Sequence, residues 1–259
     1  MRYDRSQLFK SAFVYLITTQ SPNKTMKEVV PVSCSLCNKS SISSFKDLSE
    51  EEIGKLSQSK TCSFFKKGQI LMHEGARAAG VFCIHSGKTK LYRMGTEGRE
   101  QIIRFAQGGE LVGYRSVLSG EPLSASIEAL SDTHACFIPK ALFFDFIQTN
   151  PKFSLEMMRL ACHELGEAGK LITNLAQKSV RERVAEVLMI LKDTFGETEE
   201  GYIDVSLTRE EIASMVGTVT ETAIRILSEF KESGIVILKG RKIQIVQPKE
   251  LLRIAQIFD

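Results

Sequence analysis

Short apolar runs separated by glycines fill the chain from Phe64 to Pro139. They include VFCIHSG, QIIRFAQGG and SASIEALSDTHACFIP, in which apolar and polar positions tend to alternate. Alternation with a period of two is typical of half-buried strands, and glycines favour the tight turns between them. Several short strands with regularly spaced turns predict an all-β sandwich or barrel. The bases of KTKLYR, residues 88–93, are expected to be solvated.

A helical pattern replaces the strand pattern after Asn150 and Pro151. Apolar residues recur every three or four positions in one series, which is Met158, Ala161, Leu165, Ala168, Ile172 and Leu175. Such spacing is the seam of a helix that packs against another helix. A second apolar set, made of Phe153, Met157, Leu160 and Leu171, is available for the helix's own domain. We therefore predict a homodimer joined along this helix, with the six residues of the first series at the contact.

The C-terminal stretch contains two helix starts and a hairpin. In TREE, Thr208 and Glu211 form a capping box, and the helix that follows stops at Gly217. The sequence TVTE, residues 218–221, repeats the pattern before a second helix that ends at Gly234. Two capped helices split by a glycine predict a helix-turn-helix. Two apolar strands around Gly240 then predict a β-hairpin wing.

Composition limits the class of protein. The 259 residues contain 34 Lys and Arg, 31 Asp and Glu, and 43% hydrophobic residues, which suits two globular domains. No run is long and apolar enough for a membrane span, and six cysteines are too few for a disulfide scaffold. We expect a soluble cytoplasmic protein that has no contact with a membrane.

Four stretches are expected. Residues 1–30 are an N-terminal extension, with Met26 as an alternative start to Met1, and residues 31–150 are a β-barrel domain. Residues 151–178 are the dimerisation helix, and residues 179–259 are a winged helix-turn-helix. The predicted fold class is α+β.

DNA binding is predicted from position and not from bulk charge, because residues 179–259 are net acidic. Glu221 and Arg225 lie four apart on the second helix, where a recognition helix meets base edges in the major groove. Arg pairs with guanine and Glu with cytosine. The alternative is that Glu221 and Arg225 form an ordinary surface ion pair. The expected DNA-binding residues are Thr208, Arg209, Thr218, Thr220, Glu221, Thr222, Ile224, Arg225, Lys239 and Arg241.

The strings KKGQILMHEG, GGELVGY, VRERVAEVLMIL and LTREEIASMVGTVTETAIRILSEFKESGIV together resemble the Crp/Fnr family of bacterial transcription regulators. The resemblance covers the chain from Cys34 onward. It implies a cyclic-nucleotide-binding-like jelly-roll barrel and a dimer on a pseudo-palindromic double-stranded operator. Glu221, Thr222 and Arg225 match the family's base-reading pattern, and Ile224 replaces the family's usual Ser or Gly. RNA polymerase is a further expected partner.

The resemblance does not favour cyclic AMP as the signal. Some family members bind it through a Glu and an Arg-Ser pair, and the matching positions here hold Tyr114 and Leu123-Ser124. The charged partner for the phosphate is therefore missing. Glu110 and Arg115 lie nearby and are expected to be surface charges.

The cysteines suggest that the protein senses something other than cyclic AMP. The Fnr type holds an iron-sulfur cluster through four cysteines, and Cys34, Cys37 and Cys136 match three of them, while Ser43 occupies the fourth place. Three interpretations stay open: an altered or labile cluster, a zinc or thiol-redox site, and cysteines that bind nothing. Cys62 is a candidate substitute ligand, whereas Cys83 and Cys162 are expected in the core.

The sequence gives little support to functions from other classes. A thiol-disulfide enzyme using Cys34 and Cys37 is disfavoured because the CxxC stands outside a βαβ pattern. No nucleophile with its base, P-loop or dinucleotide fingerprint appears, so we predict that the protein is not an enzyme. A module whose winged helix contacts only protein is the remaining alternative.

Overall fold

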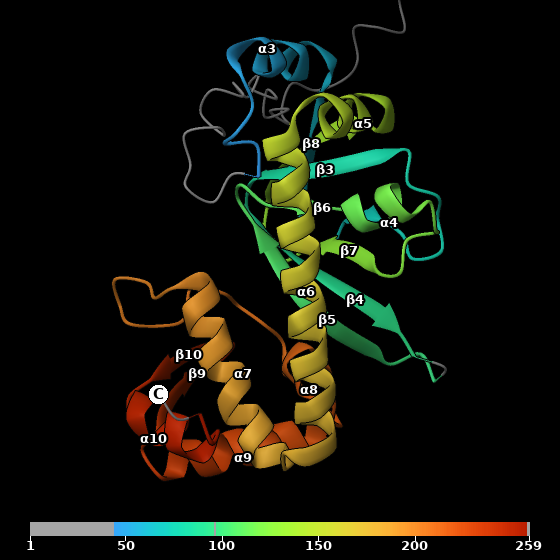
Figure 1. Ribbon diagram of the computed structural model, residues 1–259. Coiled ribbons are helices and arrows are strands. Elements are labelled where there is room, and N and C mark those ends of the chain that lie inside the picture. The colour runs from blue at the N-terminus through green and yellow to red at the C-terminus, as the bar shows by residue number, and fades with distance from the viewer. Residues whose placement is uncertain (1–43, 96, 258–259) are drawn as a thin grey trace, which may run out of the picture. The chain divides into compact units, whose positions relative to one another are not determined.

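The computed structural model describes residues 44–95 and 97–257 of this chain. Several expectations lie outside the described residues: the extension over 1–30, the choice between Met1 and Met26, and the roles of Cys34, Cys37 and Ser43. Within the described part, a two-sheet β domain is followed by a long helix and a compact C-terminal domain (Figure 1). A mixed α and β fold of this kind was expected from the alternation of patterns, and it is confirmed.

The β domain is a sandwich of two antiparallel sheets. Its strands are β1 (Thr61–Phe65), β2 (Ile70–Met72), β3 (Gly80–Ser86), β4 (Lys88–Met94), β5 (Glu100–Gln107), β6 (Leu111–Val112), β7 (Ser126–Ala129) and β8 (Thr133–Pro139). One sheet has the order β1-β8-β3-β6 and the other has β2-β7-β4-β5. Ile84, Val112 and Ala135 of the first sheet pack against Ala106 and Ile127 of the second. Their alternation along the strands gives each sheet one inward apolar face.

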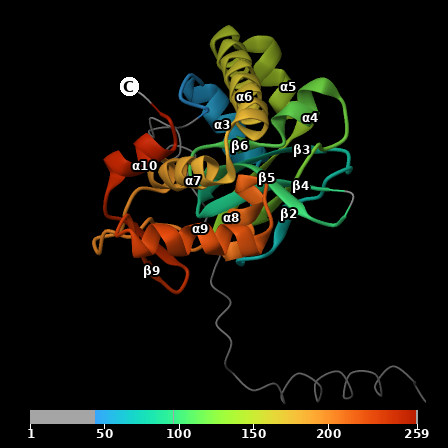
Figure 2. The same ribbon diagram turned by 90° about the horizontal axis from the view of Figure 1, so that it is seen from below.

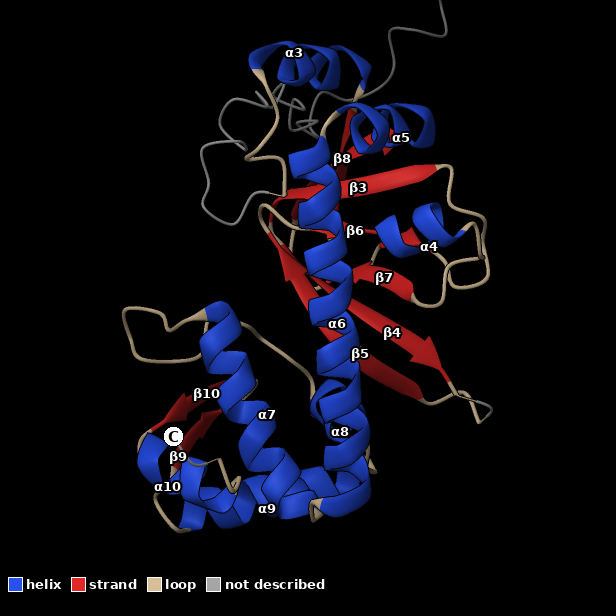
Figure 3. Cartoon of the chain, viewed as in Figure 1, coloured by secondary structure: helices blue, strands red, loops and turns tan. Residues whose placement is uncertain are grey.

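Short helices cover the outer face of the β1-β8-β3-β6 sheet. They are α3 (Glu50–Ser59) and α5 (Lys140–Thr149), and α4 (Tyr114–Ser119) follows β6 (Figure 3). The residues of this second core are Phe45, Leu48, Leu56, Val81, Cys83, Leu111, Tyr114, Val117, Ile138, Phe143, Phe146, Phe153 and Met157. Since Phe153 and Met157 belong to the next helix, the same core anchors that helix to the sandwich.

The long helix α6 spans Pro151–Gln177. Asn150 caps it, because its side chain accepts hydrogen bonds from the amides of Lys152 and Phe153. Pro151 occupies the first turn, where its missing N–H costs nothing. One helix therefore runs unbroken along the stretch for which the dimerisation helix was expected.

The C-terminal domain is a winged helix-turn-helix. It consists of α7 (Val180–Phe195), α8 (Arg209–Val216), α9 (Thr220–Glu232), β9 (Val236–Lys239), β10 (Lys242–Ile245) and α10 (Pro248–Ile254). Leu188, Ile212, Leu227 and Phe230 are almost completely buried in its core. Strands β9 and β10 pair as the predicted antiparallel wing.

One of the two predicted capping boxes is confirmed and the other is wrong. The Thr208 hydroxyl accepts from the Glu211 amide at 3.0 Å, and the Glu211 carboxylate accepts from the Thr208 amide at 2.8 Å. At α9 the N-cap is Val219, which has no side-chain cap. Gly217 ends α8 at φ 68°, and the chain then enters α9 at Thr220, so Thr218 stands one residue too early to cap.

Candidate nucleic-acid interface and sensor site

Helix α9 exposes one face and buries the other. The helix packs against α7 and α8 in the C-terminal domain (Figure 2). Ala223, Leu227 and Phe230 are in the domain core, whereas Ile224 and Arg225 are exposed. This separation follows from the helical period, because the two sets lie on opposite sides of the helix. The exposed set, together with Glu221, contains the polar groups expected to read base edges.

Arg225 has a different ion-pair partner from the one expected. The alternative interpretation paired it with Glu221, but its guanidinium binds the Glu229 carboxylate at 2.5 Å, one turn in the other direction. Glu229 also binds Arg181 at 2.8 Å. Glu229 therefore keeps a cationic partner if Arg225 turns toward another acceptor.

The start of α9 carries the three threonines expected at DNA. Thr218, Thr220 and Thr222 are half-buried around the first turn. Because no side chain caps this helix, its N-terminal end keeps the partial positive charge that attracts phosphate. The expected phosphate contacts of the threonines fit this position, and they stay predictions.

Arg209 and Thr208 have structural partners within the domain. The Arg209 guanidinium donates to the carbonyl of Gly240 at 2.9 Å, which ties α8 to the wing turn. Burial lowers the pKa of Arg209. Lys239 and Arg241 flank the same turn and are exposed. The wing thus presents two exposed cationic side chains beside a turn that Arg209 holds in place.

Most of the predicted seam of α6 is left exposed, although Ala161 packs against the core of the sandwich. Met158, Leu165, Ile172 and Leu175 are 58%, 74%, 69% and 38% exposed, although each is a large apolar residue. Ala161 is half-buried and Ala168 is exposed. The expectation that Cys162 lies in the core is wrong, because this side of α6 is also exposed. A helix with so many exposed apolar side chains at heptad spacing is typical of a helix that packs against another copy.

A buried polar network connects the sandwich to α6. Arg104 on β5 binds Glu110 at 3.3 Å and Glu164 of α6 at 2.9 Å. Tyr114, at the position aligned with the cyclic-nucleotide Glu, is buried beside Glu164, and burial followed by the Glu164 charge raises the pKa of Tyr114. Glu110 is half-buried and ion-paired, so it is not the plain surface charge expected. Arg104 thus links β5 of the sandwich directly to α6.

Lys90 is the largest departure from the sequence-based prediction. It was expected to be solvated, but it is only 4% exposed, and its ammonium group lies 2.9 Å from Glu100, 3.6 Å from Glu128 and 3.3 Å from Glu211. Glu211 belongs to α8, so this cluster joins the sandwich to the helix-turn-helix. The pattern along β4 gave no signal for it, since all three acids are distant in sequence.

Removing the Lys90 charge is expected to destabilise the fold. Burial raises the pKa of Glu128, and the Lys90 charge opposes that shift. In Lys90→Met the three carboxylates lose their cation, and we expect the free energy of unfolding to fall by about 3 kcal/mol at pH 7. A carboxyl whose pKa is higher in the folded state binds protons more tightly there, so the deficit shrinks as the pH falls toward 5. Urea unfolding at both pH values measures this.

The control is Lys55→Met, because Lys55 forms an exposed pair with Glu51 at 3.0 Å. It is expected to change stability by less than about 0.5 kcal/mol. An equal loss in the two variants, or a Lys90→Met deficit that grows on acidification, contradicts the role given to Lys90.

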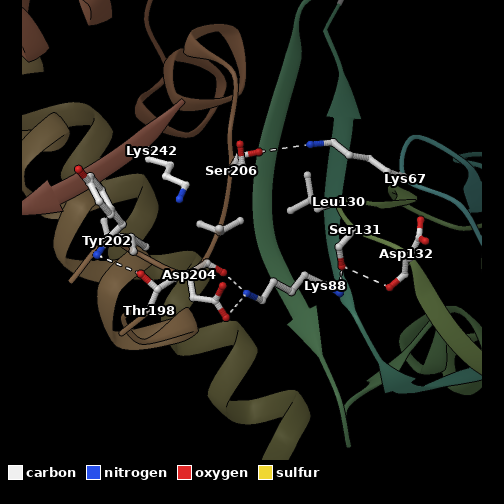
Figure 4. A pocket seen from close by; sticks show the side chains of 12 residues that line it. Lys67, Lys88, Leu130, Ser131, Asp132, Thr198, Tyr202, Asp204, Ser206 and Lys242 are labelled. Carbon is white, nitrogen blue, oxygen red and sulfur yellow. Dashed lines mark hydrogen bonds and ion pairs between the residues drawn. The ribbon is translucent and has the colours of Figure 1, made fainter. Parts of the chain in front are cut away.

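A cleft of about 400 Å³ lies between the sandwich and the C-terminal domain (Figure 4). Lys88 on one side binds Asp204 on the other at 2.8 Å, and Lys67 donates to the Ser206 carbonyl at 3.4 Å. Lys242 is paired with Glu200 at 3.2 Å. The lysines at the cleft thus bind acidic or carbonyl groups of the C-terminal domain.

The candidate metal ligand Cys136 is bonded to another cysteine. Cys62 on β1 forms a disulfide with Cys136 on β8. Among the residues that the structure describes, no three His, Cys, Asp or Glu side chains form a group able to hold a metal ion. The described part therefore places two sulfurs together, and the assignment of Cys136 as a ligand stays a prediction.

Comparison with known proteins assigns both domains. Residues 63–150 match the cyclic nucleotide-binding domain family, and residues 182–254 match the Crp-like helix-turn-helix domain family. The fumarate and nitrate reduction regulatory protein of Vibrio cholerae is 29% identical over 231 residues, covering 87% of this chain and 91% of that protein. The protein of the same name from Escherichia coli K12 is 31% identical over 194 residues, covering 73% and 76%. The chain belongs to the Crp/Fnr family.

Solved structures share the fold of this chain. The structure of FixK2 from Bradyrhizobium japonicum has a TM-score of 0.68 at 23% identity, covering 75% of this chain and 96% of that one. As a Crp/Fnr member, the chain is a DNA-binding transcription regulator with a sensing N-terminal domain, and it is not an enzyme. No helix in the described ranges is long and apolar enough to cross a membrane.

Proposed function

We propose that this Crp/Fnr regulator binds a pseudo-palindromic operator as a homodimer joined along α6. The exposed apolar seam of α6 is the observation that carries the proposal. Two copies packed there place their α9 helices in adjacent major grooves, about one helical turn apart. The same arrangement leaves a surface for RNA polymerase beside the DNA, in the cytoplasm.

Each residue on the DNA side has a proposed role. Arg225 leaves Glu229 and donates two hydrogen bonds to guanine, Glu221 accepts from cytosine, and Ile224 contacts a thymine methyl group. The hydroxyls of Thr218, Thr220 and Thr222 bind the backbone near the start of α9. Thr208, Arg209, Lys239 and Arg241 position α8 and the wing along the phosphates, which carry no sequence information.

The contacts at the end of α6 support a route from sensor to DNA. The Arg183 guanidinium donates to the carbonyl of Lys178, just after α6, at 2.7 Å and to that of Val216, at the end of α8, at 2.8 Å. A change in the direction of α6, started at Arg104 and Glu164, is therefore transmitted to the helix-turn-helix. In a dimer this changes the spacing of the two α9 helices.

Selection of binding sites from random DNA, followed by footprinting, tests the proposal. We expect a two-fold symmetric sequence with half-sites about 10 base pairs apart, centre to centre, and protection of both. Enrichment of a single asymmetric half-site, or of no sequence, contradicts the dimeric DNA-binding function.

For the signal, we propose an iron-sulfur cluster held in part by Cys34, Cys37 and Cys136. Thiolates are the ligands such clusters use, and Cys62 and Cys136 supply two neighbouring sulfurs. When bound, the cluster would supply sensitivity to oxygen or nitric oxide, and Cys136 would be the ligand that β8 contributes.

Iron, sulfide and zinc assays with a visible spectrum, on protein purified without oxygen, test the cluster. Stoichiometric iron and sulfide that are lost in Cys136→Ala and in air support it. Zinc alone, or no metal in either protein, contradicts it and turns the search to a small ligand of the sandwich. Neither result changes the DNA-binding proposal.

A further inference from the structure

Cys62 and Cys136 are placed together by strand register and not by chance proximity. Strands β1 and β8 pair antiparallel, and these two residues are direct partners with a Cα–Cα distance of 4.0 Å, although 74 positions separate them in sequence. Residues directly opposite each other in a sheet point to the same face. The backbone ladder therefore holds the two sulfurs side by side whether or not they are bonded.

A third cysteine extends the row. On its other side β8 pairs with β3, where Cys83 is the direct partner of Cys136. Cys83 is 5% exposed and packs in the core with Leu56 and Phe143. Cys136 is 4% exposed, whereas Cys62 is half-buried. A small oxidant from solvent thus meets Cys62 first, with Cys136 directly behind it.

The Cys62–Cys136 disulfide joins the strand that follows α3 to the strand that leads into α6. β1 follows α3 directly, and β8 leads through α5 into α6. DNA-binding proteins work in compartments whose thiols are kept reduced, so a disulfide there forms in response to oxidation and is reversed afterwards. A Cys62–Cys136 disulfide therefore forms, on oxidation, in the sheet whose strand β8 leads through α5 into α6.

We propose that Cys62 and Cys136 are a redox modification site, two thiols in the reducing cell and a disulfide after exposure to hydrogen peroxide. The Cys62 thiol loses its proton, and the thiolate attacks one peroxide oxygen as the O–O bond breaks. Cys62 becomes a sulfenic acid, and the hydroxide that leaves takes up the lost proton to give one water. The Cys136 thiol attacks that sulfur, the S–O bond breaks, and a second water leaves. Two thiols and one peroxide thus give one disulfide and two waters.

The modification bears on the proposed cofactor but does not depend on it. A cysteine in a disulfide has no thiolate to offer, so Cys136 cannot bind a metal and Cys62 at the same time. Thiol mapping on full-length, chelator-treated protein therefore tests the modification even if no cluster exists. Iron loading is measured separately, so the two proposals fail independently.

The experiment treats the reduced full-length protein with equimolar hydrogen peroxide, alkylates the remaining thiols and digests with trypsin. Cys62, Cys83 and Cys136 fall in separate tryptic peptides, which are residues 61–66, 78–88 and 116–140. We expect a cross-linked peptide joining 61–66 to 116–140, which disappears after reduction. In this peptide the two chains together lack the mass of two hydrogen atoms.

Variants separate this result from general oxidation. Cys62→Ser is expected to remove the cross-link and leave Cys136 alkylated, and Cys162→Ser, at the exposed cysteine of α6, is expected to leave it intact. If Cys136 links to Cys83 instead, or if both Cys62 and Cys136 remain alkylated after peroxide, the proposal is overturned. Circular dichroism of Cys62→Ser checks that the variant is folded.

Discussion

Replacing Arg225 with alanine is expected to weaken binding to the selected operator by roughly 30-fold or more. A bidentate arginine–guanine contact is worth about 1–3 kcal/mol, and a dimer loses it in both half-sites. Binding to unrelated DNA is expected to change little, because that binding comes from phosphate contacts. Fluorescence anisotropy with operator and scrambled duplexes, at one stated salt concentration, measures both affinities.

The structure makes this substitution a clean test. Arg225 is exposed and pairs only with Glu229 among the described residues, and Glu229 retains Arg181. Truncating Arg225 therefore leaves no buried charge without a partner, and the helix core of Leu227 and Phe230 is untouched. Stability and dimer formation are expected to stay close to those of the wild type.

Arg253→Ala is the matched control. Arg253 on α10 is also an exposed arginine, and it pairs with Glu250 one turn away at 2.6 Å. The control is expected to keep operator affinity within about twofold, because surface substitutions away from the interface change energies by only a few tenths of a kcal/mol. If Arg225→Ala weakens binding to the operator and to the scrambled duplex by the same factor, Arg225 is a phosphate contact and the base-reading role is wrong. The role is also wrong if Arg225→Ala and Arg253→Ala weaken operator binding equally.

The elements that sequence predicts well are those defined by local chemistry. The Thr208 capping box, Gly217 at positive φ and the wing turn at Gly240 each depend on residues within four positions of one another. The prediction failed at α9, where the same local pattern was present but began at Thr218, one residue before the actual N-cap Val219. A capping motif indicates that a helix starts nearby, and the turn geometry decides which residue begins it.

Contacts between distant segments were not predictable. Lys90 looked like a solvated strand residue, because its partners Glu100, Glu128 and Glu211 come from β5, β7 and α8. Cys62 was named only as a candidate substitute metal ligand, and nothing in the sequence indicated that the β1–β8 register places it opposite Cys136. A period along one strand shows which face a residue occupies and says nothing of the neighbour across the sheet.

The α6 seam combines both kinds of information. Its spacing predicted an apolar stripe, and the structure shows that the stripe is left exposed by its own domain. The sequence analysis assigned Phe153 and Met157 to the helix's own domain, and the structure buries both of them. The exposed set is the one available to a second copy.

Leu165→Glu is therefore expected to convert the dimer into monomers. Leu165 is 74% exposed in the single chain. In the proposed two-fold dimer the Leu165 side chain of each protomer is buried. Burying a leucine is worth about 1.5–3 kcal/mol, so losing two weakens association by roughly 100-fold or more, before the cost of two carboxylates in an apolar seam is added. Sedimentation velocity over a range of concentrations measures the shift.

Since α9 helices from two protomers are needed for a full site, the Leu165→Glu variant is also expected to lose cooperative protection of the second half-site. His163→Glu is the control, because His163 is exposed on the opposite side of α6 and receives the same charge. It is expected to remain a dimer with normal footprints. A dimeric Leu165→Glu protein, or monomers produced equally by His163→Glu, means that the protomers do not join along this seam.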